Sequence, residues 1–180
     1  MQNDLVELIQ WFKANKLSLN VSKTNVVLFS NIHIPDYGNL YLNIENELIK
    51  LSDTAKFLGM FLDYRLNWNV QTSYIKKKMS CALYILNSTK HVVDTFHLKT
   101  LYYTLCHPYL TYGIILWGSA ARKYLRPIEI LQNKAVRIIT NSTYNCHASQ
   151  LKKSLDVLKL HDNLKVEVSK FMYFFHFNNK

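Results

Sequence analysis

The sequence predicts an α+β protein, in which a small mixed piece of about 66 residues precedes a basic, all-helical piece. Short apolar runs rich in β-branched and aromatic residues gather before residue 66, whereas apolar residues recur at helical spacing after it. The net charge changes at the same place. Residues 1–66 carry 6 basic and 7 acidic side chains, and residues 67–180 carry 16 and 5. We therefore expect two domains, divided at 66/67.

The composition indicates a folded chain with a polyanionic partner. Apolar types make up 49% of the 180 residues, and 4 glycines and 3 prolines exclude collagen-like or low-complexity chains. The net charge of +10 favours a polyanion. Three cysteines without a C-x-x-C pair, and an N-terminus without a basic signal region, favour a nuclear or cytoplasmic location. Pro108 interrupts the charge-free stretch 100–121, so we expect no membrane partner.

The first 66 residues contain one helical pattern and several strand patterns. Apolar side chains at helical spacing predict a helix over residues 3–15. The β-branched run at 25–29 predicts a strand, and the run at 57–62, apolar on both faces, predicts a buried strand. The remaining expected elements are a turn at 36–39 and a hairpin of residues 41–44 and 48–51.

The sequence of residues 67–180 predicts a series of helices. A helix of about 20 residues is predicted by an apolar stripe of Ile75, Met79, Ala82 and Leu86. Pro127 suits the first turn of a further helix. Its apolar side is expected to comprise Ile128, Leu131, Ala135 and Ile139. The other expected elements are a helix at 94–106, an apolar segment at 109–117 and a helix carrying Leu164, Val168, Phe171 and Phe175.

The residue types alone show no catalytic centre. The sequence has no G-x-S-x-G, Walker A or H-E-x-x-H motif. Its aspartates are isolated along the chain, whereas two-metal phosphoryl chemistry needs clustered carboxylates. The Cys-His pairs at 106–107 and 146–147 are adjacent, which is not ligand spacing for a tetrahedral site. We therefore expect neither a metal site nor a cofactor within this chain.

Three blocks of sequence occur in a fixed order over roughly residues 3–140. They are Trp11 with NKLSLNVSKT at 15–24 and VLF at 27–29; KFLGMFLD at 56–63 with Leu66 and Trp68; and Leu101-Tyr, His107-Pro, Tyr112-Gly, Trp117-Gly and QNKAVR at 132–137. Together they resemble the downstream part of a reverse transcriptase (RNA-directed DNA polymerase) of a non-LTR, LINE-type or jockey-like retrotransposon. The fragments correspond to the region after the catalytic strand, the primer-grip segment and the helices that follow it.

The resemblance implies that residues 1–66 are the end of a polymerase palm with a primer-grip hairpin, and that residues 67–180 are an α-helical thumb and its continuation. It implies RNA-templated DNA synthesis, with Mg²⁺, by the intact enzyme. The family's metal-binding aspartates would lie before Met1. We therefore expect this chain to be inactive alone, and to act with the upstream palm and fingers of the same polyprotein.

The resemblance also indicates site residues. Lys23 matches the lysine of the K-T block, which would act as a general acid in an intact enzyme; the alternative is a solvated turn lysine. Phe57, Leu58 and Gly59 match the primer grip, where glycine permits close approach to a primer end, or else mark a bulge in a buried strand. Phosphate contacts on an RNA–DNA hybrid or duplex are expected from Lys76, Lys77, Lys78, Lys134 and Arg137, unless these form only a solvated basic face.

Other interpretations remain open at this point. The chain could be a non-catalytic nucleic-acid-binding remnant of a retrotransposon, a helical module whose basic face meets an acidic protein, or a product that does not fold. Trp68 and Trp117 are expected in the core rather than as base-stacking platforms. The aromatic run 171–177 is expected to leave an exposed apolar patch.

Overall fold

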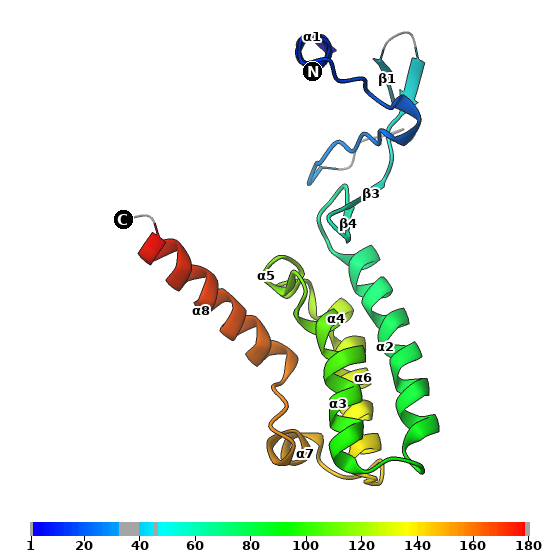
Figure 1. The fold of residues 1–180 in the computed structure, drawn as a ribbon, viewed down its shortest axis with the longest axis vertical. Helices are drawn as coiled ribbons and strands as arrows, with labels where there is room; N and C mark the ends of the chain where they lie inside the picture. Colours follow the sequence, from blue (N-terminus) through cyan, green and yellow to red (C-terminus); the bar gives the residue numbers. More distant parts are fainter. Residues whose placement is uncertain (1, 33–39, 45–46, 179–180) are drawn as a thin grey trace. The chain divides into compact units, whose positions relative to one another are not determined.

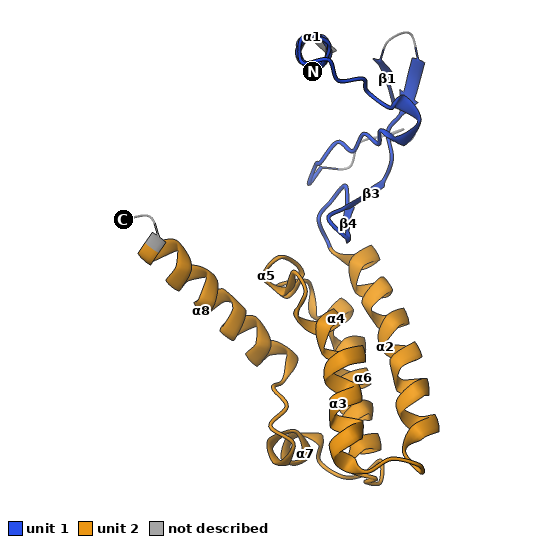
Figure 2. Ribbon diagram, in the orientation of Figure 1, with its two compact units in different colours: residues 1–67 blue, residues 68–180 orange. Residues whose placement is uncertain are grey.

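The computed structural model describes residues 2–32, 40–44 and 47–178, and it divides into two compact units, residues 1–67 and 68–180 (Figure 2). Over the described ranges the chain forms eight α-helices, one 3-10 helix and two small antiparallel sheets of two strands each (Figure 1). The prediction of an α+β fold is confirmed at this level.

The first unit combines a helix with two hairpins. The helix predicted over 3–15 is confirmed as α1 (Gln2–Ala14), and the hairpin predicted at 41–51 is confirmed as β1 paired with β2. The unit's small apolar cluster centres on Leu42 and Leu51. The remaining bounds are η1 (Val21–Lys23), β1 (Tyr41–Ile44), β2 (Glu47–Lys50), β3 (Thr54–Phe57) and β4 (Met60–Asp63).

Two strand predictions in this unit are wrong. Residues 25–29 form no strand, and Val26 makes an isolated parallel bridge to Leu51. A β-branched run needs a neighbouring strand to build a ladder, and the described chain supplies only this one pairing. Residues 57–62 are not one buried strand, because the chain reverses at Leu58 and Gly59 between β3 and β4. The turn expected at 36–39 lies outside the described residues.

The second unit is all helical. The predicted helices of about 20 residues and of residues 94–106 are confirmed as α2 and α3. Asp94 is the N-cap of α3, and its side chain accepts a hydrogen bond from the main-chain N–H of His97. The bounds are α2 (Asn69–Thr89), α3 (Thr95–Leu105), α4 (His107–Thr111), α5 (Ile114–Trp117), α6 (Arg122–Ile139), α7 (Ala148–Ser154) and α8 (Leu160–Asn178).

The core of this unit lies where α2 packs against α6, its most extensive helix contact. The predicted stripe on α2 is confirmed, since Ile75, Met79, Ala82 and Leu86 are all buried. On α6, three of the four predicted residues are buried and Leu131 is half-buried. The predicted core tryptophans differ in burial: Trp117 is fully buried and Trp68, before α2, is half-buried.

Pro127 does not occupy the first turn of its helix, so that prediction is wrong. The helix α6 begins at Arg122, and Pro127 lies inside it. Proline lacks a main-chain N–H and removes one i→i−4 hydrogen bond. The buried apolar side of α6 provides packing energy that offsets this loss.

Residues 100–121 are broken into α3, α4 and α5, with Pro108 in the first turn of α4. Among the described residues, no helix is both long and apolar enough to cross a membrane.

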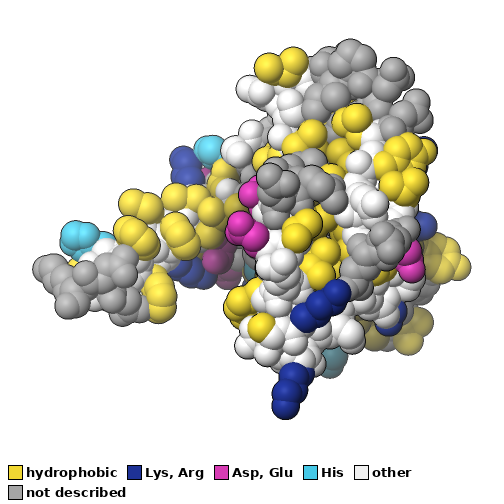
Figure 3. All heavy atoms as spheres, turned by 90° about the horizontal axis from the view of Figure 1, so that it is seen from above, with side chains coloured by type: hydrophobic (Ala, Val, Ile, Leu, Met, Phe, Trp, Pro, Cys, Tyr) yellow, Lys and Arg dark blue, Asp and Glu magenta, His cyan; other side chains and the backbone are white. Residues whose placement is uncertain are grey.

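The expected exposed aromatic run is confirmed on α8, where every side chain from Phe171 to Phe177 is exposed. Figure 3 shows these hydrophobic side chains along the helix that projects to the left.

Candidate nucleic-acid interface

The helix pair α2–α6 presents basic side chains from both helices into shared grooves. The first groove has a volume of about 340 Å³ and is lined by Lys76 and Ser80 of α2. Its opposite wall belongs to the first half of α6 and comprises Lys123, Arg126, Pro127, Ile130 and Leu131. Lys76, Lys123 and Arg126 are exposed, so three cationic side chains that are far apart in sequence are available around one open groove.

A second groove of about 310 Å³ lies at the other end of the same helix pair. It is lined by Lys90, directly after α2, and by Lys134 and Arg137 of α6, with Ile138, Asn141, Ser142 and Tyr144. The middle of α2 therefore lies beside the first half of α6, and the C-terminal ends of the two helices also lie side by side. We call Lys76, Lys90, Lys123, Arg126, Lys134 and Arg137 the α2–α6 basic surface.

Helical spacing explains why α6 contributes four of these cations. Successive residues of an α-helix are about 100° apart. Lys123, Arg126, Lys134 and Arg137 therefore fall within one face, opposite the buried Ile128 and Ile139 face. No carboxylate among the described residues lines either groove. The surface accordingly suits a polyanion.

Arg137 has a structural contact as well as a charge. Its Nε and Nη2 atoms donate to the carbonyl oxygen of Cys146 at 3.3 and 3.0 Å. Its guanidinium carbon lies 5.2 Å from the centroid of the Tyr144 ring. Arg137 therefore fixes the loop after α6 in addition to charging the second groove.

The structure separates the three consecutive lysines of α2. Only Lys76 lines the first groove. Lys77 is exposed about 100° further around the helix. Lys78 is half-buried, with its Nζ 5.6 Å from the centroid of the Tyr74 ring, and that ring lies 6.3 Å from the Tyr109 ring of α4. Lys77 and Lys78 do not join the grooves.

Lys90, Lys123 and Arg126 were not among the residues expected from the sequence. The recurrence of cations at helical spacing along α6 is a signal that could have found Lys123 and Arg126. No local signal marks Lys90, which joins the surface because α2 packs beside α6.

Lys23 ends a short 3-10 turn in the first unit and is exposed. The Asn20 side chain caps this turn, because its Oδ1 accepts hydrogen bonds from Lys23 N at 3.2 Å and from Ser22 Oγ at 2.7 Å. The turn therefore fixes the main chain at Lys23 and leaves its ammonium group in solvent.

Phe57, Leu58 and Gly59 lie together at the tip of the β3–β4 hairpin. Leu58 has φ 45° and Gly59 has φ 80°, as a two-residue loop with two left-handed central residues requires. The apolar side chains of Phe57 and Leu58 are 63% and 74% exposed. The tip therefore displays two large apolar groups to solvent.

The described residues show no metal centre, and the buried thiol of Cys106 is not activated. Among those residues, no three His, Cys, Asp or Glu side chains are grouped so that they could hold a metal ion. Burial raises the pKa of Cys106 to about 12, so its thiol stays protonated at neutral pH. Burial also lowers the pKa of the neighbouring His107. The residues that the structure describes therefore do not fit a magnesium site.

No family model matches the chain, and no solved structure matches it. Curated proteins of Drosophila melanogaster match the chain over nearly its whole length. The chain is 25% identical over 90% of its length to a probable RNA-directed DNA polymerase from transposon X-element, and 26% identical over 95% to a corresponding protein from transposon BS. It is 27% identical over 96% of its length to the RNA-directed DNA polymerase from mobile element jockey.

The chain spans less than a fifth of these relatives, 18–19% of each. The matches confirm the resemblance drawn from the three sequence blocks. Over nine-tenths or more of its length, this chain is thus homologous to RNA-directed DNA polymerases of jockey-like non-LTR retrotransposons.

Proposed function

We propose that this chain is part of a retrotransposon reverse transcriptase and holds the primer–template through phosphate contacts on the α2–α6 basic surface. The observation that carries this proposal is the alignment of two grooves, both lined by lysine and arginine, along one helix pair. The relatives are named RNA-directed DNA polymerases, and this name indicates nucleic acid as the substrate class.

The size of this surface fits a short length of duplex. Lys123 and Lys134 are 11 residues apart on α6, or about 16 Å along the helix axis. Duplex DNA carries one charge per about 1.7 Å, so about nine phosphates lie along that length and roughly half of them face one side. Contacts to about five phosphates position a duplex without reading its sequence. An A-form RNA–DNA hybrid would be recognised by shape.

The two units would have different roles in the intact enzyme. Residues 1–66 would be the end of the palm with the primer grip, and residues 67–180 the thumb and its continuation. The exposed tip at Phe57 and Leu58 supports the grip assignment, since those side chains are available to a primer end. Lys23 would be a general acid only in the intact enzyme. The Mg²⁺ of that enzyme would be held by aspartates of the upstream palm. This chain would act together with the palm and fingers of the same polyprotein, in the nucleus or cytoplasm.

Binding of an RNA–DNA hybrid by the full chain tests the proposal. We would compare a triple variant, Lys76→Gln, Lys123→Gln and Arg126→Gln, with a control triple, Lys77→Gln, Lys153→Gln and Lys165→Gln, which removes the same charge from exposed sites outside both grooves. Fluorescence anisotropy at low salt should show at least a tenfold loss of affinity for the groove variant and less than threefold for the control. Equal losses in both variants would refute the assignment of the surface.

Primer extension separates an active polymerase from a non-catalytic binding module. We expect the chain alone to give no extended product, because its described residues supply no set of metal-binding carboxylates. Extension by the purified chain would overturn that part of the proposal and leave the binding test unaffected.

A further inference from the structure

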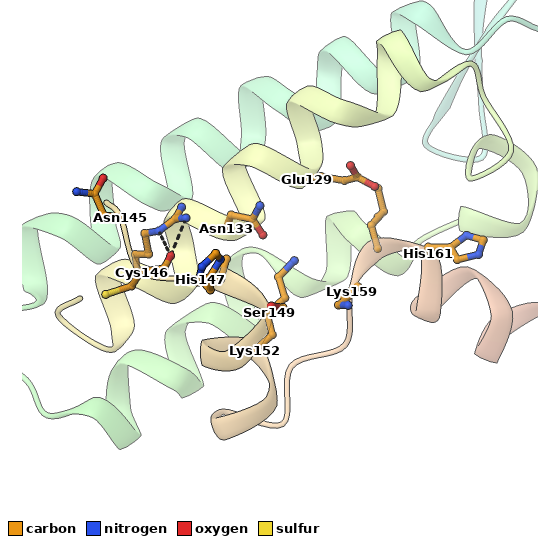
Figure 4. Close-up of a pocket in the computed structure, with 12 residues that line it drawn as sticks. Glu129, Asn133, Asn145, Cys146, His147, Ser149, Lys152, Lys159 and His161 are labelled. Carbon is orange, nitrogen blue, oxygen red and sulfur yellow. Dashed lines mark hydrogen bonds between the residues drawn. The ribbon is translucent and has the colours of Figure 1, made fainter. Parts of the chain in front are cut away.

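A third pocket of the second unit is separate from the two grooves. It has a volume of about 410 Å³ and is bounded by α6, α7, the loop between them and the start of α8 (Figure 4). Its charged and imidazole side chains are Arg137, Lys152, Lys159, His147, His161 and Glu129. Cations therefore outnumber the single carboxylate in its lining.

Lys152 is the unusual member of this set. It is only 6% exposed, and its Nζ donates a hydrogen bond of 2.8 Å to Oε1 of Gln132. The Gln132 amide nitrogen in turn donates to the Tyr102 hydroxyl at 3.1 Å and to the Leu158 carbonyl at 2.8 Å. Gln132 is the one acceptor of Lys152 within the described residues, so two of the three ammonium N–H donors remain for an occupant of the pocket.

The charge of Lys152 is not matched by a carboxylate at contact distance. No ion pair within 4.0 Å involves Lys152 in the part of the chain that the structure describes. Burial lowers the pKa of Lys152 to about 8; Glu129 and Asp162 oppose the shift, and Lys159 and Arg137 add to it. Buried charged groups are usually paired with a group of opposite charge, and the Lys152 ammonium has no such negatively charged partner within 4.0 Å among the described residues.

We propose that this pocket binds a phosphate group, carried by a nucleotide or by the end of a nucleic-acid strand, with Lys152 and Lys159 as its main charged contacts. A phosphate monoester offers two negative charges and three strong acceptor oxygens, which match the two remaining N–H donors of Lys152 and the neighbouring cations. The volume lies within the range of small-molecule sites, so a nucleoside fits beside the phosphate. The inference goes beyond hybrid binding, and among the pocket's residues only Arg137 is shared with a groove.

Calorimetric titration of the full chain with adenosine 5′-monophosphate and with inorganic phosphate tests this site. Lys152→Gln should weaken nucleotide binding at least tenfold, as expected for loss of a charge-assisted contact. Lys159→Gln should also weaken it, and because Lys159 is exposed, this second variant does not disturb the core. The matched control is Lys153→Gln, an exposed neighbour on α7 that does not line the pocket and should leave affinity unchanged.

A pair of oligonucleotides, one with a 5′-phosphate and one with a 5′-hydroxyl, identifies the source of the phosphate. If strand ends are the ligand, the phosphorylated oligonucleotide should bind more tightly, and Lys159→Gln should remove the difference. If free nucleotides are the ligand, the mononucleotide should bind and the two oligonucleotides should be equivalent. Absence of binding by every phosphate probe at millimolar concentration, or affinities equal in all three variants and the parent chain, would overturn the proposal. Hybrid binding through the grooves does not depend on either outcome.

Discussion

Gln132 of α6 and Lys152 of α7 are joined inside the second unit by a 2.8 Å hydrogen bond from the lysine Nζ to the amide Oε1. The same glutamine donates to Tyr102 of α3 and to the main chain at Leu158, just before α8. One buried side chain thus ties α6 to three other segments. The hydrogen bonds of Gln132 favour this one packing of the helices, because another arrangement would leave the buried Gln132 amide unpaired.

Replacing Gln132 by leucine should destabilise the chain strongly. Gln132→Leu keeps most of the volume but leaves Lys152 without its acceptor, and it removes the hydrogen-bond partner of the Tyr102 hydroxyl. We expect a loss of about 2–4 kcal/mol in the free energy of unfolding, measured by urea denaturation. Gln150→Leu, at an exposed position of α7, is the control and should change stability by less than about 0.5 kcal/mol. A loss below 1 kcal/mol for Gln132→Leu would contradict the role of the network.

Stability should rise with pH between about 8 and 10 because of Lys152. Its pKa is lowered to about 8 in the folded chain, from 10.5, so in this window the unfolded chain binds the proton more strongly and the folded state gains relative stability as pH rises. Relative to Lys152→Met, the parent chain should gain about 1–2 kcal/mol over this range, after allowance for solvent in the pocket. Urea titrations at pH 7.5, 9 and 10 measure the gain. If the free energy of unfolding changed with pH by the same amount in the parent chain and in Lys152→Met, this prediction would be wrong.

The tip of the β3–β4 hairpin should tolerate asparagine at position 58 but not a β-branched residue at position 59. Gly59 has φ 80°, and Gly59→Val should cost on the order of 1–2 kcal/mol in local stability. Leu58→Asn should be neutral or stabilising, because asparagine accepts the left-handed conformation that Leu58 adopts at φ 45°. Amide hydrogen exchange across Thr54–Asp63 reports the change. Equal exchange in the two variants would contradict the turn geometry.

The exposed aromatic run on α8 should promote self-association. The run includes Phe171, Phe174 and Phe177, whose side chains are 54–67% exposed. An exposed apolar patch of this kind favours association with other apolar surfaces, because association removes it from water. Changing all three to serine should shift the sedimentation profile toward monomer. The control is the triple Lys165→Ser, Ser169→Ala and Lys170→Ser, which alters the same helix outside the aromatic run and should leave the profile as it was. Persistence of the parent's association in the aromatic variant would exclude this patch as its cause.

Helices with an apolar stripe were predictable from the sequence. The spacing of Ile75, Met79, Ala82 and Leu86 defines one face of α2, and all four are buried against neighbouring helices. A local pattern is enough here because each helix forms its main-chain hydrogen bonds within itself. The family resemblance was also readable, since its residues lie in contiguous blocks.

Features that depend on partners distant in sequence were not predictable in the same way. Residues 25–29 have strand-like composition, but strand formation depends on a pairing neighbour. The reversal at Leu58 was hidden because leucine rarely takes a positive φ. The start of α6 ahead of Pro127 follows from packing rather than from proline preference. Lys76 and Lys90 form one surface with the cations of α6 only because α2 packs against α6.

The salt dependence of RNA–DNA hybrid binding tests the central claim most directly. With about five phosphates engaged, log K should fall with log salt concentration at a slope of roughly −4.5 for the parent chain. The triple variant Lys76→Gln, Lys123→Gln and Arg126→Gln should reduce the slope toward about −2, since each lost phosphate contact removes about 0.9. A flat response of the parent chain, or an unchanged slope in the variant, would contradict a phosphate-binding role for the α2–α6 basic surface.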